Sequence, residues 1–387
     1  MAKHFSPSKK NSPMKNQWNK NSNRNVGNKQ FSGQFLEINP DAKFLDGEQV
    51  EGIHLVTDFD LVRQLQVRFG QCANGPTDFF PAMWPVNLST GNISSLESEP
   101  HVVTPKPYGT RYLLYVNPSG EMFLENMTQH IFRIDDDHAI QMISSDGQSI
   151  TDVILDGVVT RVSEKHPDAG RLTFVIMDAT LCRGVGLTHM GISQRIAFVK
   201  DAIVTPRLEA LKNGTIKSDG EAFNLDIVEC KESYEAEKFL SEEFRDVLFK
   251  YSLLSILFIP RDKRYTCGTC YDVFQWKEND VCRAVFRKKI PEGSSATAEF
   301  AELHVVGPGG MDMKFASIKL TDEIRELNDR IIDCYYVDNQ WVFKKLRNDR
   351  QHPNGRIAVT NTLEVFKNPV TRSRLLTSLD IARRRLL

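Results

Sequence analysis

The chain has 387 residues, of which 41% are hydrophobic and 26% are charged, so it can form two or three folded domains. The formal net charge of −1 excludes a protein that binds polyanions through its overall charge. No run approaches eighteen consecutive apolar residues, and seven cysteines spread over a long chain are typical of a reducing compartment. We therefore expect a soluble intracellular protein without a membrane-spanning helix.

The first 30 residues differ from the rest in charge, because they hold seven cations and no acid. They are rich in Asn, Ser and Lys, and they cannot bury enough apolar surface to offset chain entropy. We expect residues 1–33 to be a disordered basic tail. Its charge is compatible with a nucleic-acid contact, with a nuclear import signal or with a merely solvated tail. It has no apolar core of a secretory signal.

The folded pattern begins near residue 34. Leu61, Leu65 and Phe69 recur about one helical turn apart, which predicts a helix over 59–69. Three prolines between 76 and 85 predict a loop. Further helices are predicted at 193–203, 233–249 and 373–387. Short β-branched and aromatic segments bounded by turn residues predict strands at 112–116, 122–124, 131–134, 153–162, 172–177 and 253–259.

Beyond Trp276 the strands are short and are separated by glycine-rich turns. They are predicted at 284–286, 301–306, 315–318, 331–337 and 341–344. Five strands in about seventy residues is the size of a small five-stranded barrel.

One C-x-x-C pair, Cys267 and Cys270, lacks the second ligand pair of a zinc site. It also lies in a predicted strand and turn rather than at the start of a helix, where a redox pair is usual. We interpret it as a packing feature and predict no metal site.

A set of ordered segments carries a family resemblance. They read FFPAMWPVNLS, KPYGTRYLLYV, LDGVVTRV, LTFVIMDAT, VKDAIVTPR, SILFIPRDKRY, CGTCYDVFQWK, WVFKKLRNDRQHPN and NPVTRSRLL. In order and spacing, the chain from about residue 35 onward resembles the guanylyltransferase half of metazoan-type mRNA capping enzymes. The triphosphatase half, with its HCxxxxxR loop, has no counterpart in the sequence.

The resemblance implies an α+β fold. A nucleotidyltransferase domain of antiparallel sheets with helices, similar to ATP-grasp folds, is expected over 34–277. An OB-fold β-barrel lid is expected over 278–350 and a helical segment over 351–387. In such enzymes a lysine attacks the α-phosphate of GTP with Mg²⁺ present, and the resulting lysyl-GMP passes its GMP to the 5′ diphosphate of nascent RNA.

The resemblance assigns site residues position by position. Lys106 matches the nucleophile of the K-x-D-G motif and Arg111 matches the arginine that follows it. Lys277 matches the second lysine of the K-W-K motif. The lid motif R-x-D-K is matched by Arg347, Asp349 and Arg350. We expect these residues to bind nucleotide or phosphate.

Four positions depart from the family pattern. Tyr108 replaces the aspartate of the nucleophile motif, Val158 replaces the glutamate of a D-G-E strand, and Leu254 replaces the aspartate of a D-G-L-I-F strand. Gln275 replaces the first lysine of K-W-K. Three carboxylates are therefore lost, and carboxylate oxygens are the protein ligands that Mg²⁺ prefers.

Three hypotheses follow. The first is an inactive guanylyltransferase homologue with a basic cleft for GTP, a cap or an RNA 5′ end, acting in RNA processing. The second is an active mRNA guanylyltransferase with a rearranged site, in which Asp156 or Asp178 compensates for the lost carboxylates. The third is a protein-interaction scaffold. We expect no cofactor, with Mg²⁺ and GTP required only by the active form. The expected partners are RNA-processing or transcription proteins, and the expected location is the nucleus, with the cytoplasm as the alternative.

Overall fold

The computed structural model describes residues 38–386 except 46–47, 78, 241–249, 279–280, 292–297, 349 and 351. The predicted basic tail, residues 1–33, and the predicted phosphate ligand Asp349 lie outside the described residues. None of the described helices combines the length and the apolar character needed to cross a membrane.

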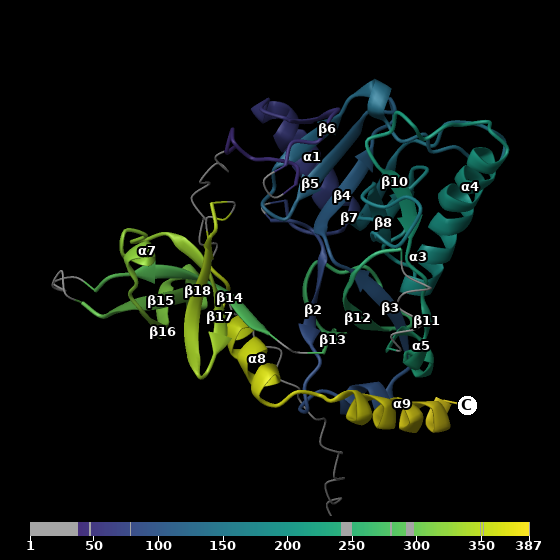
Figure 1. The fold of residues 1–387 in the computed structure, drawn as a ribbon. Coiled ribbons are helices and arrows are strands. Elements are labelled where there is room, and N and C mark those ends of the chain that lie inside the picture. The colour runs from purple at the N-terminus through teal and green to yellow at the C-terminus, as the bar shows by residue number, and fades with distance from the viewer. Residues whose placement is uncertain are drawn as a thin grey trace, which may run out of the picture. The chain divides into compact units, whose positions relative to one another are not determined.

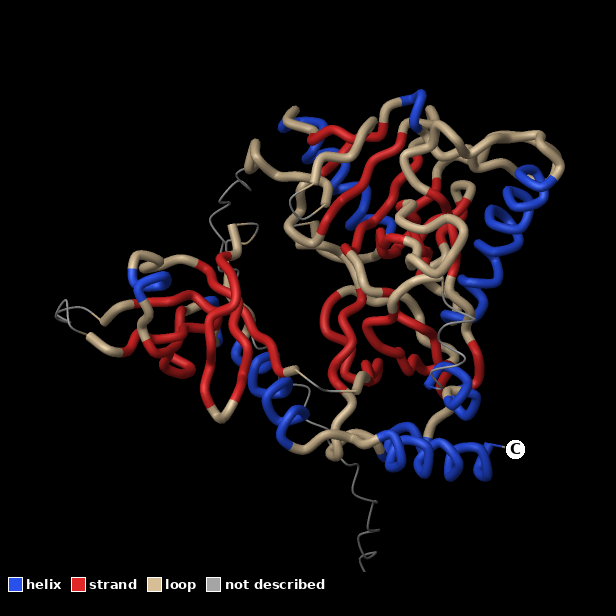
Figure 2. Tube along the Cα trace, viewed as in Figure 1, coloured by secondary structure: helices blue, strands red, loops and turns tan. Residues whose placement is uncertain are grey.

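Strands make up most of the regular structure (Figures 1 and 2). The strands are β1 Ile53–Leu55, β2 Met83–Asn87, β3 His101–Pro107, β4 Thr110–Val116, β5 Met122–Asn126, β6 Ile131–Ile134, β7 Val153–Arg161, β8 Leu172–Cys182, β9 Val185–Gly186, β10 Asn224–Ile227, β11 Lys231–Glu232, β12 Leu253–Pro260, β13 Gly268–Trp276, β14 Cys282–Lys289, β15 Phe300–Val306, β16 Asp312–Lys319, β17 Ile331–Val337 and β18 Gln340–Leu346.

The α-helices in the described part of the chain are fewer than the strands. They are α1 Phe59–Cys72, α2 Ser94–Ser98, α3 Ile192–Val199, α4 Thr205–Lys212, α5 Glu237–Leu240, α7 Asp322–Arg325, α8 Arg356–Lys367 and α9 Arg372–Leu386. Lys200–Val204 forms a π-helical turn that joins α3 to α4. The helix predicted at 193–203 is therefore confirmed. The helical segment continues beyond residue 203 into α4, which the apolar spacing did not indicate.

The first sheet has the order β1-β6-β5-β4-β7-β8-β10, with β9 paired to β8. Its pairs are antiparallel except for β10 and β8. One face packs against α1, through Leu65 and Phe69 of the helix and Leu113 and Phe123 of the sheet. The other face forms a larger core that includes residues from α3 and from the turn that follows it.

The second sheet has the order β11-β3-β12-β13-β2. Its face carries Phe258 and Phe274, which pack with Leu96 of α2 and with Leu375 and Leu379 of α9. The C-terminal helix predicted at 373–387 thus buries its apolar stripe on this sheet (Figure 1).

Two strands of this second sheet were not predicted: β2, at the end of the predicted loop, and β3, for which no element was predicted. β2 contains Pro85 and lies at the sheet edge, where a proline removes no ladder hydrogen bond on the open side. β3 contains Pro105 and Pro107 on either side of Lys106. The Tyr108 N–H bonds to Ser252 O on the β12 side, so by alternation the nitrogens of both prolines face the opposite side. The β11 ladder on that side reaches only Val102 and Val103.

The third sheet has the order β16-β15-β14-β17-β18 and contains the five strands predicted beyond Trp276. The expected closed barrel is not found, because no hydrogen-bonded ladder joins β16 to β18 in the part of the chain that the structure describes. Alternation along each strand predicts the number of strands, whereas closure depends on strand tilt and stagger, which single strands do not encode.

The helix predicted at 233–249 is described only in its first part. Ser233–Glu235 forms a 3-10 turn and α5 covers Glu237–Leu240. Residues 241–249 lie outside the described residues.

Candidate active site

Lys106 lies in β3, opposite Ser255 of β12. Its Nζ donates a hydrogen bond to Oε1 of Gln275, 3.1 Å away on β13. Burial, the largest cause, and the nearby cations Arg111 and Lys277 together lower the pKa of Lys106 to about 8, and Asp156 opposes them. The amine is therefore protonated at pH 7 but loses its proton more easily than an exposed lysine.

A tight approach of two strands follows Lys106. A Cβ added at Gly109 would lie 2.2 Å from the carbonyl oxygen of Val159, so only glycine fits between β3 and β4 here. The glycine of the KPYGTR run is thus explained by backbone packing against β7.

Arg111 is fixed by one carboxylate and by aromatic rings. Its Nε and Nη2 donate to the two oxygens of Asp156 at 2.8 and 2.6 Å, and its Nη1 donates to Met83 O at 2.8 Å. The guanidinium lies 5.1 Å from the ring centre of Trp84 and 6.0 Å from that of Phe80. Burial alone would lower the pKa of Arg111, but the Asp156 carboxylate reverses this and the pKa is raised.

Both carboxylate oxygens of Asp156 accept hydrogen bonds. It is fully buried, it forms the bidentate pair with Arg111, and it accepts a third hydrogen bond from the Tyr265 hydroxyl at 2.9 Å. Tyr265 also donates to Pro81 O at 3.2 Å. Met83, Trp84 and Tyr265 are site residues that the motif comparison missed, although FFPAMWPVNLS was singled out as a segment.

The second nearby carboxylate is paired in the same way. Asp178 accepts hydrogen bonds from Arg195 Nε at 2.6 Å and Nη2 at 2.7 Å, and from the Ala179 N–H at 2.8 Å. Burial raises the pKa of Asp178 and Arg195 opposes that rise. The Arg195 side chain is completely buried.

The three positions where the family has a carboxylate and this chain does not differ in their solvent exposure. Tyr108 is 62% exposed and Leu254 is 38% exposed, on the neighbouring strand segments that pair at Pro107 and Leu253. Val158 is buried and lies directly opposite Arg111 in the ladder between β4 and β7. Two of the three lost carboxylates therefore stood at positions that still face solvent in this chain.

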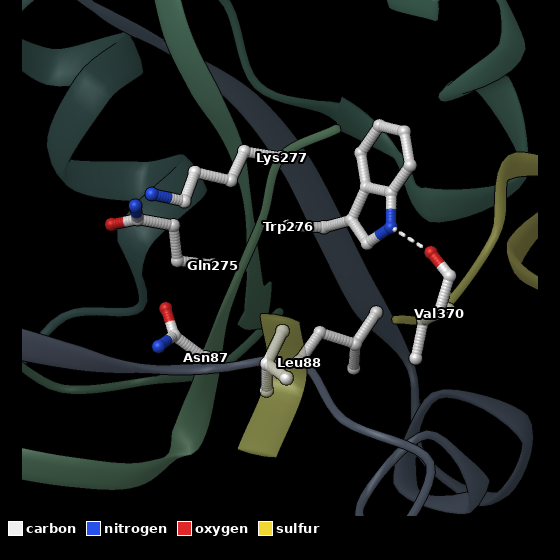
Figure 3. A pocket seen from close by; sticks show the side chains of 7 residues that line it. Asn87, Leu88, Gln275, Trp276, Lys277 and Val370 are labelled. Carbon is white, nitrogen blue, oxygen red and sulfur yellow. Dashed lines mark hydrogen bonds between the residues drawn. The ribbon is translucent and has the colours of Figure 1, made fainter. Parts of the chain in front are cut away.

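Gln275 of β13 and Lys277, which directly follows the strand, extend to the same side. Figure 3 shows their side chains on one side together with Asn87, while Trp276 points to the other side. The Trp276 indole N–H donates to Val370 O at 2.8 Å, which fixes the end of the strand. Burial lowers the pKa of Lys277. The structure thus brings together Lys106, Arg111, Gln275 and Lys277 of the predicted set.

The two described lid residues come after the last strand of the third sheet. Arg347 and Arg350 follow β18, where the Arg347 N–H donates to Ile331 O at 2.9 Å. The arginine of the VTPR run, Arg207, is buried in α4 and pairs with Glu221, so it serves the core of the first domain.

No group of three or more His, Cys, Asp or Glu side chains is arranged to hold a metal ion among the described residues. Cys267 and Cys270 are free thiols, and Cys270 is buried in β13. The predicted absence of cofactors is not tested by these observations.

Two family models match the chain. Residues 45–279 match "mRNA capping enzyme, catalytic domain" and residues 269–376 match "mRNA capping enzyme, C-terminal domain". With the sheets described above, they confirm the predicted order of a nucleotidyltransferase-like domain of antiparallel sheets and helices followed by a C-terminal domain.

The curated relatives are longer than this chain. It is 26% identical over 348 residues to the mRNA-capping enzymes of Danio rerio and of Mus musculus, with 88% of this chain and 56% of each relative covered. It is 25% identical over 367 residues to that of Caenorhabditis elegans, with 92% and 57% covered. The chain spans about half the length of the curated relatives it matches.

Solved structures of DNA ligases show a weaker likeness. A mycobacterial DNA ligase D complexed with ATP and MES is 15% identical with a TM-score of 0.37, over 70% of this chain and 95% of that one. Chlorella virus DNA ligase-adenylate is 13% identical with a TM-score of 0.31, over 70% and 100%.

Proposed function

Because the chain belongs to the mRNA capping enzyme family, we propose that it is a guanylyltransferase-like protein that binds the phosphates of a nucleotide or RNA 5′ end without forming a lysyl-nucleotide. One observation carries the proposal. Asp156 and Asp178, which could replace the lost carboxylates, are both held by guanidinium groups.

The metal requirement of the family does not fit these residues. Mg²⁺ demands near-octahedral oxygen coordination, usually with one or two carboxylates and several waters. Binding it at Asp156 would require breaking a bidentate pair with Arg111 and would leave that buried guanidinium unpaired. Tyr108, Val158 and Leu254 supply no carboxylate. Without metal-assisted stabilisation of charge, transfer of a nucleotidyl group would be slower by several orders of magnitude.

The cations that remain suit phosphate binding. Lys106 and Lys277 are both half-buried, and Asp156 forms a direct pair with Arg111 and with neither lysine among the described residues. Arg111 contributes less, because its charge is offset by the bidentate pair. A site with two ammonium groups and amide donors attracts a phosphate without needing a metal.

A second candidate function is guanylyl transfer through a rearranged site. The lowered pKa of Lys106, about 8, favours it, because a nucleophilic lysine must lose its proton before attack. The third hypothesis, a protein-interaction scaffold, requires no ligand in the cleft. For each of the three, RNA-processing or transcription proteins are the proposed partners and the nucleus is the proposed location.

A covalent labelling assay separates the first two functions. The full chain is incubated with α-labelled GTP and Mg²⁺ or Mn²⁺, and protein-bound label is measured after denaturation. We expect no label. A label that disappears in Lys106→Ala would overturn the proposal and establish the transferase.

A binding assay then separates phosphate binding from a scaffold. Anisotropy is measured with one RNA sequence carrying either a 5′-triphosphate or a 5′-hydroxyl, and with GTP and a cap analogue as competitors. We expect a preference for 5′-triphosphate that Lys106→Met and Lys277→Met abolish. Lys212→Met, an exposed cation at the end of α4, is the control. Equal binding of both RNA forms by the unaltered chain would favour the scaffold.

A further inference from the structure

The outer face of the third sheet carries a row of side chains that the guanylyltransferase motifs do not include. Arg283 of β14 pairs with Tyr335 of β17, which pairs with Val342 of β18. Their neighbours Cys282, Cys334 and Trp341 point into the core, so by strand alternation the row lies on the opposite face.

A bulge adds a second cation beside the row. Asp333 pairs with Lys345 and Cys334 pairs with Phe343, which leaves Lys344 as the extra residue of β18. Its Nζ donates to the Tyr335 hydroxyl and lies 4.5 Å from the centre of that ring. Arg283, Tyr335, Val342 and Lys344 are called the outer-face patch below.

The carboxylate that pairs with Arg283 is buried. Arg283 Nε donates to Asp333 at 2.6 Å, and the Asp333 side chain has no solvent exposure, whereas that of Arg283 is 39% exposed. The hydrogen bond to Asp333 raises the pKa of Arg283, and the cationic Arg347 nearby opposes that rise. The accessible charge of the patch is therefore positive.

The patch also exposes apolar surface. Val342 and Val337, at the β18 and β17 ends of this face, are each 49% exposed, and Tyr335 is partly exposed between them. A sheet face that only meets water is typically polar. Cross-strand pairing with Lys344 accounts for the orientation of Tyr335, but it does not account for the exposed valines beside it.

We propose that the outer-face patch binds single-stranded RNA, with a base stacked on Tyr335 and backbone phosphates contacting Arg283 and Lys344. Aromatic side chains flanked by cations on the strands of a small barrel-like sheet are the features that bind single strands without sequence preference. An acidic peptide would use the cations but would gain little from the aromatic ring. The site needs no 5′ phosphate, so it goes beyond the phosphate-binding cleft around Lys106.

The first test measures affinity with a 5′-hydroxyl RNA 12-mer and the full chain. Because the probe has no 5′ phosphate, failure here leaves the proposed function of the cleft untouched. We expect Tyr335→Ala to weaken binding about tenfold, the effect of losing one stacked base. Tyr335→Phe should retain the affinity, since it keeps the ring. Tyr271→Ala, a 70% exposed tyrosine of β13, is the matched control and should bind like the unaltered chain.

Salt dependence tests the phosphate contact. For single strands each neutralised phosphate contributes about 0.7 to the slope of log affinity against log salt. Lys344→Ala should lower the slope by roughly that amount. The basic N-terminal residues are present in every variant, so their contribution to RNA binding cancels in these comparisons.

Photocrosslinking locates the contact directly. RNA containing 5-iodouridine should crosslink to Tyr335. Unchanged affinity in Tyr335→Ala, together with crosslinks confined to residues 1–30, would overturn the proposal. Competition by poly-glutamate that is equal in the unaltered chain and in Tyr335→Ala would also overturn it, because it would show a purely ionic surface.

Discussion

Two buried carboxyl groups lie on the same face of the first sheet in very different surroundings. Leu113 of β4 pairs with Asp156 of β7 on one side and with Glu125 of β5 on the other. The two acids are therefore two strands apart, roughly 10 Å. Asp156 accepts three hydrogen bonds, whereas neither oxygen of Glu125 has a hydrogen-bond partner among the described residues.

The difference shows how a buried acid keeps or loses its charge. Burial raises the pKa of Glu125 to about 8, so this side chain holds its proton at pH 7. Asp156 faces a guanidinium that stabilises its carboxylate, and that same guanidinium withholds it from a metal. For chemistry at Lys106, a nearby carboxylate is useful only if its oxygens are free to bind a metal ion.

The largest expected effect comes from breaking the pair at Asp156. Asp156→Ala leaves the buried guanidinium of Arg111 without its counter-ion and the Tyr265 hydroxyl with a weaker set of partners. We expect the free energy of unfolding, measured by urea denaturation, to fall by about 3–5 kcal/mol.

Asp272→Ala is the matched control for that loss. Asp272 pairs with Lys263 at 2.7 Å but is 46% exposed, so its removal should cost less than about 1 kcal/mol. A similar loss of unfolding free energy in both variants would show that burial does not increase the contribution of the Asp156 pair to stability.

The second effect concerns Glu125 and pH. The unfolded chain releases this proton near pH 4.5 and the folded chain near pH 8, so between these values the folded state binds more protons. Stability should therefore fall as pH rises from about 4.5 to about 8. Glu125→Leu should remove this contribution to the slope and raise stability at pH 8 by about 1–3 kcal/mol.

Glu164→Leu, at an exposed loop position, serves as the comparison for Glu125→Leu. It should leave the pH dependence of unfolding unchanged. If Glu125→Leu also leaves that dependence unchanged, then Glu125 does not hold its proton in the folded chain, contrary to what its unpartnered oxygens indicate.

A third, smaller effect tests the partner of Lys106. Gln275→Glu places a carboxylate where an amide oxygen now accepts from Nζ, and should raise the pKa of Lys106 by about 1–3 units. Gln275→Lys restores the family's residue and should lower it below about 8. The measurement is the pH midpoint of Lys106 acetylation by mass spectrometry, with Lys212 in the same digest as the internal reference. Identical midpoints in the two variants would contradict a direct contact.

Local pattern predicted much of the fold. The strand bounds at Ile131–Ile134 and Ile331–Val337 follow from β-branched and aromatic residues between turn residues, and they agree with the structure. No strand was predicted around Lys106, which lies between two prolines, yet it lies in β3. Only the sheet order explains this, since β11 ends before reaching the prolines.

The positions of the candidate site could be predicted from the sequence, but the hydrogen bonds and ion pairs among them could not. The family resemblance implied one cleft for Lys106, Arg111 and Lys277, and in the structure Arg111 and Lys277 are close enough to lower the pKa of Lys106. The Arg111–Asp156 pair joins residues 45 apart through the register of β4 on β7. Asp156 was therefore counted as a possible metal ligand from sequence, although its oxygens are already engaged.

The last prediction supplies carboxylates that no guanidinium holds. Tyr108 and Leu254 are solvent-facing, so Tyr108→Asp with Leu254→Asp should change stability by less than about 0.5 kcal/mol per site in the absence of metal. Their sequence neighbours Pro107 and Leu253 pair across the two strands, and we expect the new carboxylates to bind one ion together. At a Mg²⁺ concentration ten times the dissociation constant, binding would stabilise the fold by about 1.4 kcal/mol. Thermal unfolding should therefore shift upward with Mg²⁺ in the double variant and not in Tyr108→Asn with Leu254→Asn. A shift of equal size in the unaltered chain would mean that Asp156 or Asp178 can leave its arginine for a metal, and the distinction between near and available carboxylates would not hold.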